Sequence, residues 1–159
     1  MKNHMCNDES PWKKKYKEQI KSVAICYGVA SFCDRAFKDC KGLKSVQIPN
    51  SVTLIGSDAF SGCEGLTSMT IPKSVTSIAK NLFYNCKRLT SIVIPGSVKE
   101  IGHWAFQEFN EFKSITIADS VTFIGRGAFF GCDRPTSIVI PNSFTEIGGF
   151  GFQNCSGLN

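Results

Sequence analysis

The chain has 159 residues and a formal net charge of +5, from 18 Lys and Arg residues against 13 Asp and Glu residues. Hydrophobic residues make up 42% and charged residues 19% of the chain, which excludes a disordered or collagen-like protein, and the length suits one globular domain. Every apolar run is far shorter than the ~20 residues that a membrane-spanning helix needs. Composition therefore excludes several classes of protein but indicates no particular chemistry.

Residues 1–19 are rich in charge and contain no long apolar stretch. We predict that they form an N-terminal tail and that they are not a secretory signal peptide. The basic stretch from Lys13 to Lys17, with Tyr16 inside it, is of a kind that contacts nucleic acid or an anionic membrane surface. Nearby acidic residues dilute this charge, so we favour a solvated segment and expect no nucleic-acid partner.

From Leu43 onward the sequence repeats every 23 residues without an insertion. Two successive blocks read LTSMTIPKSVTSIAKNLFYNCKR and LTSIVIPGSVKEIGHWAFQEFNE, and counting backwards in the same register gives one more block before Leu43. A fixed period of this length is typical of a solenoid. We predict repeats one to six at 20–42, 43–65, 66–88, 89–111, 112–134 and 135–157, with 158–159 beginning an incomplete repeat.

Within a repeat, positions are counted from 1 to 23. Apolar residues at positions 4 and 6, such as Ile92 and Ile94, alternate with polar or small residues and predict a half-buried strand. A proline follows in most repeats and ends strand pairing. A second extended piece, Val-x-x-Ile, comes next. It is followed by a glycine (Gly56, Gly102, Gly125 or Gly148) that allows a positive φ or a close backbone approach. Ala-Phe-x-x-Cys near the end has room for one loose helical turn.

One repeat cannot bury its own apolar side, so the repeats must stack. We predict an α/β solenoid with a parallel sheet on one face and short extended or helical turns on the other. At about 4.8 Å per layer, the Phe at position 18 of every repeat forms one aromatic stack. Its members are Phe37, Phe60, Phe83, Phe106, Phe129 and Phe152.

The recurring string, as in LTSIVIPGSVKEIGHWAF, closely resembles the BspA-like, or treponemal-type, leucine-rich repeat of surface proteins from host-associated bacteria and some parasitic protists. This resemblance implies a leucine-rich repeat fold and a non-catalytic, adhesin-type or interaction role. It implies a cell-surface or secreted location, with a cytoplasmic one as the alternative. It also implies that SPWKKKYKEQIKSV is a capping segment, in which Trp12 and Tyr16 pack over the first layer.

Five of the eight cysteines occupy position 21 of their repeats. Stacked about 5 Å apart with parallel Cα–Cβ bonds, they are poorly placed for disulfides, whose Cβ atoms converge to about 3.8 Å. We therefore predict a ladder of buried thiols, because free cysteine behaves as a small hydrophobic residue. A bridge between Cys26 and Cys33 is left open. The ladder consists of Cys40, Cys63, Cys86, Cys132 and Cys155.

Catalytic groups do not gather in any recognisable pattern. The two histidines, His4 and His103, cannot assemble a zinc site or a Cys–His nucleophilic pair. Glu100 and Glu146 lie two repeats apart, about 9–10 Å, which overlaps the spacing of an inverting glycosidase pair, but two solvated carboxylates explain them better. Phosphate-binding, hydrolase and dinucleotide motifs do not occur. We predict no enzyme activity, no cofactor and no metal site.

Binding is expected at positions that differ between repeats, because the repeated positions serve the stack. Positions 2, 3 and 5 should face outward from the strands and give a polar face. Two or three of the large apolar residues at other variable positions, Leu54 among them, should form a flank, which Tyr84 and Phe130 either join or underlie. The expected partner is a protein, by the resemblance a host or matrix protein. The candidate contact residues are Lys44, Gln47, Thr70, Val93, Thr116 and Val139 on the strand face, and Trp104, Phe123 and Phe150 on the flank.

Leu158 and Asn159 begin a further block, so the last complete layer carries no cap in this sequence. An open sheet edge invites pairing with another chain. The alternative function is therefore a structural or self-assembly role, in which two copies form a homodimer through the C-terminal end of the solenoid.

Overall fold

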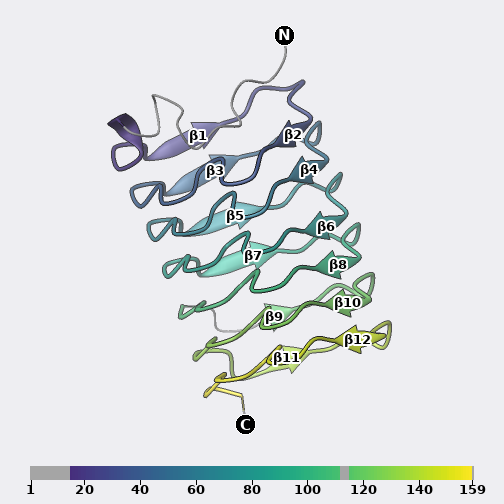
Figure 1. The fold of residues 1–159 in the computed structure, drawn as a ribbon. Helices are drawn as coiled ribbons and strands as arrows, with labels where there is room; N and C mark the ends of the chain where they lie inside the picture. Colours follow the sequence, from purple (N-terminus) through teal and green to yellow (C-terminus); the bar gives the residue numbers. More distant parts are fainter. Residues whose placement is uncertain (1–14, 112–114, 159) are drawn as a thin grey trace.

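The computed structural model describes residues 15–111 and 115–158, which form a parallel β-solenoid. Short strands stack in two rows, odd-numbered strands in one row and even-numbered strands in the other (Figure 1). The odd row is β1 (Ser22–Ala24), β3 (Ser45–Gln47), β5 (Ser68–Thr70), β7 (Ser91–Val93), β9 (Ile115–Thr116) and β11 (Ile138–Val139). The even row is β2 (Ser31–Phe32), β4 (Leu54–Ile55), β6 (Ser77–Ile78), β8 (Glu100–Ile101), β10 (Phe123–Ile124) and β12 (Glu146–Ile147).

Strand pairing confirms the 23-residue period. Ser22 pairs with Ser45 and Ser68 pairs with Ser91, in both cases with the residue 23 positions further on. In the even row, β6, β8, β10 and β12 form one four-stranded parallel sheet, while β1–β3, β5–β7, β9–β11 and β2–β4 form two-stranded parallel sheets. The predicted stacking of equivalent residues is therefore confirmed.

The alternating sequence of the odd strands explains which side they bury. In β3 and β5 the central Val46 and Met69 are buried, and the residues on both sides of each are exposed. In the even row the isoleucine at position 13, as in Ile78 and Ile101, is buried in repeats two to five. Both rows therefore turn one face towards a shared interior and the other face towards solvent.

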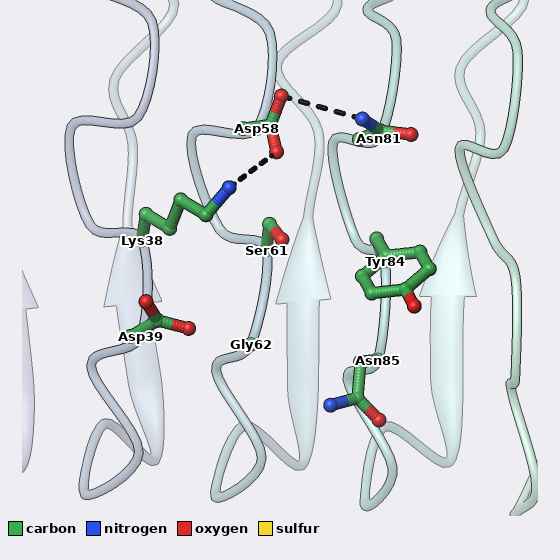
Figure 2. A pocket seen from close by; sticks show the side chains of 8 residues that line it. All are labelled: Lys38, Asp39, Asp58, Ser61, Gly62, Asn81, Tyr84 and Asn85. Atoms are coloured by element: carbon green, nitrogen blue, oxygen red, sulfur yellow. Dashed lines mark hydrogen bonds and ion pairs between the residues drawn. The ribbon is translucent and has the colours of Figure 1, made fainter.

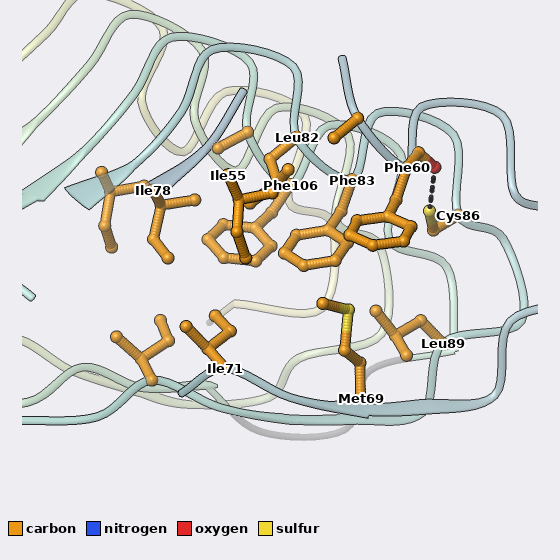
Figure 3. Close-up of a cluster of buried hydrophobic side chains, with 14 of the residues drawn as sticks. Ile55, Phe60, Met69, Ile71, Ile78, Leu82, Phe83, Cys86, Leu89 and Phe106 are labelled. Carbon is orange, nitrogen blue, oxygen red and sulfur yellow. Dashed lines mark hydrogen bonds between the residues drawn. The ribbon is translucent and has the colours of Figure 1, made fainter. Parts of the chain in front are cut away.

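The predicted phenylalanine stack fills that interior and runs through all six layers. Neighbouring ring centroids lie between 5.2 Å, for Phe106 and Phe129, and 6.0 Å, for Phe60 and Phe83, and the ring planes are within 14° of parallel. Figure 3 shows Phe60, Phe83 and Phe106 in this arrangement. Phe60 and Phe83 are completely buried. Burial of each ring contributes roughly 1.5–3 kcal/mol of transfer free energy.

The glycines at position 14 serve a close backbone approach. A Cβ added to Gly102 would lie 2.7 Å from the backbone nitrogen of Lys80, and one added to Gly125 would lie 2.6 Å from that of His103. The positive φ values fall elsewhere, at positions 16 and 20 of every repeat, in addition to Gly28. They belong to Arg35, Asp39, Asp58, Gly62, Asn81, Asn85, Trp104, Glu108, Gly127, Gly131, Phe150 and Asn154.

These left-handed residues give the turn segment its own hydrogen-bonded ladder. In repeat three the N–H groups of Asn81, Phe83 and Asn85 donate to carbonyl oxygens of the next repeat at 3.0, 2.9 and 3.2 Å. The same three donors recur in the neighbouring repeats. Because buried backbone groups must find partners, this ladder lets the turns stack without forming helices. The described parts of the repeats contain no helix.

The position-21 cysteines form the predicted thiol ladder. Cys63, Cys86, Cys132 and Cys155 donate from Sγ to a phenylalanine carbonyl of the preceding repeat, at 3.0–3.3 Å. These four are free thiols, and Cys63, Cys86 and Cys132 are buried while Cys155 is half-buried. Cys40 is buried at the same position of the first repeat.

At the N-terminal end, the bridge that was left open is absent, and the expected inward packing of Tyr16 is wrong. Cys26 is a free, exposed thiol, whereas Cys33 is disulfide-bonded, so no bridge joins the two. Tyr16 does not pack inward: its side chain is 42% exposed, and the Nζ of Lys15 lies 5.3 Å from the ring centroid, an attraction that leaves the ring in water. Trp12 lies outside the described residues.

Candidate functional site

The strand-face residues come together in the structure. Gln47, Thr70, Val93, Thr116 and Val139 all occupy position 5, so stacking places them in one exposed column along the odd strands. Val93 and Val139 are the apolar members, at 64% and 63% exposure. Lys44, at position 2 of repeat two, is exposed beside this column. All six strand-face candidates therefore lie on the same side of the solenoid, although β7 and β9, which carry Val93 and Thr116, do not pair with each other.

Part of the hydroxyl-rich surface is already engaged within the solenoid. Thr67 donates its hydroxyl to the carbonyl of Lys44, and Thr90 donates to that of Thr67, at 3.4 and 3.1 Å. Ser97 and Ser120, in the turn after the odd strands, donate in the same way to Val75 and Val98. These hydroxyls hydrogen-bond between layers and are therefore less available to a partner. The side chains at position 5 are accordingly the main contact groups that the strand face offers.

The flank centres on Trp104 and Phe150, which share position 16 two repeats apart. The Trp104 ring meets Phe130 edge-on at 5.9 Å between centroids. Arg126 places its guanidinium carbon 5.9 Å from the Trp104 ring and 4.8 Å from the Phe150 ring. The Trp104 ring also lies across Gly127, where an added Cβ would overlap it. Four side chains therefore form one cluster, which we call the aromatic flank.

Trp104 and Phe150 hold an unfavourable backbone conformation, with φ of 57° and 64°. A left-handed conformation costs residues with a Cβ roughly 1–2 kcal/mol, and bulky side chains adopt it rarely. Asp58 and Asn81 occupy the same position in repeats two and three and suit it better. Strained residues of this kind often accompany functional surfaces.

Phe123 is linked to the aromatic flank through His103. It lies on β10, between Glu100 of β8 and Glu146 of β12, and its half-buried ring meets His103 edge-on at 6.3 Å. His103 in turn accepts a hydrogen bond at Nδ1 from the backbone N–H of Arg126, at 2.8 Å. Glu100 and Glu146 are both exposed, one on each side of Phe123.

Phe130 and Tyr84, whose place relative to the flank was left open, lie in different parts of the molecule. Phe130 is half-buried and packs on Trp104, whereas Tyr84 lines a hollow in repeats one to three (Figure 2). Arg126 was missed by sequence reasoning, which considered only apolar residues for the flank. Its position between two large rings, one layer from each, is the signal that could have identified it.

The buried Cys63 and Cys86 thiols are unsuited to nucleophilic chemistry at neutral pH. Burial raises the pKa of Cys63 and Cys86 well above its ordinary value. The hydrogen bond with Cys155 is the main cause that raises the pKa of Cys132, and burial is the second cause. The same hydrogen bond lowers the pKa of Cys155 to about 7. Within 15–111 and 115–158, His, Cys, Asp and Glu form no group of three that could hold a metal ion. Nor does that part contain a helix long and apolar enough to cross a bilayer.

Comparison with known proteins identifies the repeat. Residues 30–159 match the family model described as the BspA type leucine rich repeat region, in six copies. No curated protein sequence matches the chain.

Two solved structures resemble the chain in both sequence and fold. A leucine-rich repeat protein from Bacteroides ovatus shares 34% identity with a TM-score of 0.81 over 87% of this chain, which spans only 38% of that protein. A leucine-rich repeat protein from T. pallidum shares 30% identity with a TM-score of 0.83, over 87% of this chain and 67% of the other. A leucine rich cell surface protein from Faecalibacterium prausnitzii, at 22% identity and a TM-score of 0.51 over 89% of this chain and 60% of its own, shows a shared fold alone.

Proposed function

Because this chain belongs to the BspA-type leucine-rich repeat family, we propose that it is a non-catalytic module that binds a protein partner through the aromatic flank. The observation that supports this most strongly is the clustering of the exposed Arg126 and Phe150 with the half-buried Trp104. Tryptophan and arginine are enriched among the residues that dominate binding energy in protein interfaces. The position-5 column of the strand face supplies a second, weaker contact region.

We further propose an adhesin-type role at the cell surface or in secretion. The repeat pattern supports this, since the sequence resembles repeats of bacterial surface proteins. The Faecalibacterium prausnitzii protein described as a leucine rich cell surface protein has the same fold. The partner class is then an extracellular matrix or host-cell protein.

The test is binding of the purified chain to a panel of immobilised extracellular matrix proteins. We expect saturable binding to at least one of them, weakened by Trp104→Ala and by Phe150→Ala. A hot-spot residue costs at least ~2 kcal/mol on truncation, which is roughly a 30-fold loss of affinity. Leu54→Ala is the matched control, because Leu54 is 55% exposed and lies outside the flank.

Retention of full affinity by both flank variants would remove the aromatic flank from the proposal. Equal loss in the Leu54→Ala variant would show a general effect on folding or solubility. Position 5 is tested by Val93→Ser and Val139→Ser, each expected to weaken binding by a smaller factor than the flank variants.

Self-association is a second candidate function, favoured by the exposure of the last layer. Ile140 and Ile147 are each 43% exposed, whereas Ile117 and Ile124, at the same positions one repeat earlier, are buried. A second copy packed on this layer of the 159-residue chain would cover that apolar area. Light scattering over a range of concentrations tests it, and a strict monomer would contradict it.

A further inference from the structure

A histidine and an aspartate make the same interlayer hydrogen bond at position 15 of their repeats. In repeat one, Oδ1 of Asp34 accepts a hydrogen bond at 2.7 Å from the backbone N–H of Ser57, the position-15 residue of the next repeat. In repeat four, Nδ1 of His103 accepts one at 2.8 Å from the backbone N–H of Arg126. The two bonds therefore tie equivalent turns together, but one acceptor is a carboxylate and the other is an imidazole.

The hydrogen bond to His103 supports the aromatic flank through the backbone of Arg126. The carbonyl oxygen of Arg126 accepts from the N–H of Trp104 at 3.0 Å, so both peptide groups of Arg126 are tied to repeat four. The guanidinium of Arg126 in turn contacts the rings of Trp104 and Phe150. One of the two backbone supports of Arg126 is therefore lost whenever Nδ1 of His103 stops accepting.

Only the neutral imidazole can make this bond. In a neutral ring one nitrogen carries a proton and the other accepts, so an accepting Nδ1 places the proton on Nε2. In the imidazolium both nitrogens carry protons, and Nδ1 of His103 would then oppose the N–H of Arg126. Histidine changes its charge between about pH 5 and 8, whereas an aspartate carboxylate stays largely ionised in that range. The bond in repeat four therefore depends on pH where its counterpart in repeat one does not.

Two cations lie next to His103 in the position-15 column. Lys80 precedes it by one repeat and Arg126 follows it by one repeat, and all three side chains are exposed. The layers approach closely here, because a Cβ added to Gly102 would lie 2.7 Å from the backbone nitrogen of Lys80. Both neighbours repel a positive charge on His103. Protonation therefore disfavours the position that the ring holds against the Arg126 backbone.

Negative charge lies on the other side of His103, along the even strands. Glu100 of β8 and Glu146 of β12 are exposed on either side of Phe123 of β10 (Figure 1). The Phe123 ring meets His103 edge-on at 6.3 Å. Lys99, beside Glu100, offsets part of this charge. Two carboxylates and an aromatic ring nevertheless attract a cation, so the protonated ring gains partners on the strand side.

We propose that His103 is a pH switch for the aromatic flank. The neutral ring holds the backbone of Arg126, and with it the guanidinium against Trp104 and Phe150. The protonated ring releases Arg126 and turns towards Glu100, which weakens partner binding at low pH. The effect on binding rests on the proposed function, but the hydrogen bond is measured on the chain alone, so the two can fail separately.

The experiment is NMR of the ¹⁵N-labelled chain, titrated from about pH 8 to about pH 5. At the higher pH a scalar coupling across the hydrogen bond should join the backbone nitrogen of Arg126 to Nδ1 of His103, and the ring should carry its proton on Nε2. The coupling should vanish as His103 titrates, and the Arg126 amide proton should shift upfield. The Ser57 amide, whose acceptor is Asp34, is the internal control and should keep its hydrogen bond.

Two outcomes of this titration would overturn the proposal. One is a ring that carries its proton on Nδ1 at the higher pH, since that nitrogen could not accept. The other is an Arg126 amide that stays in place while His103 titrates.

Variants at position 103 separate the switch from other titrating groups. His103→Asn retains an oxygen acceptor, as Asp34 does in repeat one, but has no charge to change, so its Arg126 amide should stay in place over the whole range. His103→Ala removes the acceptor and should show the low-pH shift of the Arg126 amide at every pH. An Arg126 amide that still follows pH in His103→Asn would assign the change to another group and overturn the proposal.

Binding to the matrix protein selected from the panel tests the consequence for the flank. Between pH 7.5 and 5.5 the affinity of the unmodified chain should fall by about threefold to fivefold relative to that of His103→Asn, because one pre-organising hydrogen bond is lost. The same pH dependence in both chains would contradict control of the flank by His103. Absence of binding at every pH would contradict the proposed function, and the NMR titration would then decide the switch.

Discussion

The turn side of the solenoid has two halves with one backbone and opposite chemistry. Position 16 is Arg35, Asp58 and Asn81 in repeats one to three, and Trp104, Gly127 and Phe150 in repeats four to six. All six residues have positive φ, and the same interlayer hydrogen bonds run through both halves. The first half carries a hollow lined mainly by polar side chains, and the second half carries packed aromatic side chains.

This difference shows which parts of the repeat are free to carry function. Interior positions are apolar in both halves, because each layer must cover the next. Positions 15, 16, 19 and 20 change from repeat to repeat while the chain path stays the same. Side chains at these positions therefore determine what the surface recognises, even where, as at Trp104 and Phe150, they fit the backbone poorly.

The largest effect is expected from breaking the shared interior. Phe83→Ala removes a completely buried ring from the middle of the stack and should lower the free energy of unfolding by about 3–5 kcal/mol. Phe152→Ala, at the half-buried end of the stack, is the control and should cost clearly less. Urea unfolding measures both, and equal losses would mean that the stack is not a continuous interior.

High pH should weaken the scaffold under both halves. Burial holds the pKa of Cys63 and Cys86 above its unfolded value of about 8.5, so above that pH the unfolded chain releases protons that the folded chain keeps. The contribution of these thiols to stability is therefore fully present below pH 8.5. Above pH 8.5 the free energy of unfolding falls by about 1.4 kcal/mol per pH unit for each thiol. Urea unfolding at rising pH measures the slope.

The Cys63→Ala/Cys86→Ala double variant is the control for this slope. It should be less stable at neutral pH, because two buried side chains are truncated, but its stability should fall less steeply between pH 9 and 10. A slope identical to that of the unmodified chain would mean that other groups cause the loss.

Two glycine substitutions should separate the halves. Gly127→Ala forces a Cβ into the Trp104 ring at a φ of +61° and should cost about 1–3 kcal/mol. Gly62→Ala meets a similar restriction beside Asp39, at a φ of +72°. Only Gly127→Ala should shift tryptophan fluorescence, because it displaces Trp104. A fluorescence change in Gly62→Ala would contradict the independence of the two halves.

The smallest effect concerns backbone strain. Phe150→Asn places at position 16 a residue that tolerates a left-handed φ and so relieves backbone strain. The free energy gained in this way should offset the loss of the contact between Phe150 and Arg126. Stability should be unchanged or rise by up to about 1 kcal/mol in thermal unfolding, while partner binding through the flank is lost. A drop of more than that amount would mean that Phe150 is retained for stability.

Most of the fold could be predicted from the sequence, because a repeat displays each constraint six times. The aromatic stack, the exposure of position 5 and the thiol ladder follow from residues such as Phe60, Val93 and Cys63, whose neighbours in space are their own counterparts. The choice of 20–42 as the first repeat stays a prediction, because the register fixes the period and not the starting point.

Features that depend on φ or on unlike neighbours could not be predicted. For Gly102 and its equivalents the sequence allowed either a positive φ or a close backbone approach, and the structure shows the close approach. The positive φ values occur instead at positions 16 and 20, for example at Asn81 and Asn85. Arg126 was missed for a different reason: its place one layer from both Trp104 and Phe150 is visible in the sequence, but only apolar residues were considered for the flank. Cys26 is a free thiol. The sequence left its pairing open, because disulfide pairing depends on three-dimensional geometry that spacing along the chain does not encode.

A crystal structure of the 159-residue chain would test the stacking most directly. Each strand residue should lie beside the residue 23 positions further on, with centroids of successive position-18 rings 5.2–6.0 Å apart and Trp104 and Phe150 at positive φ. A register of 22 or 24 residues between any two layers, or rings that do not face one another, would contradict the assignment of interior, strand face and flank.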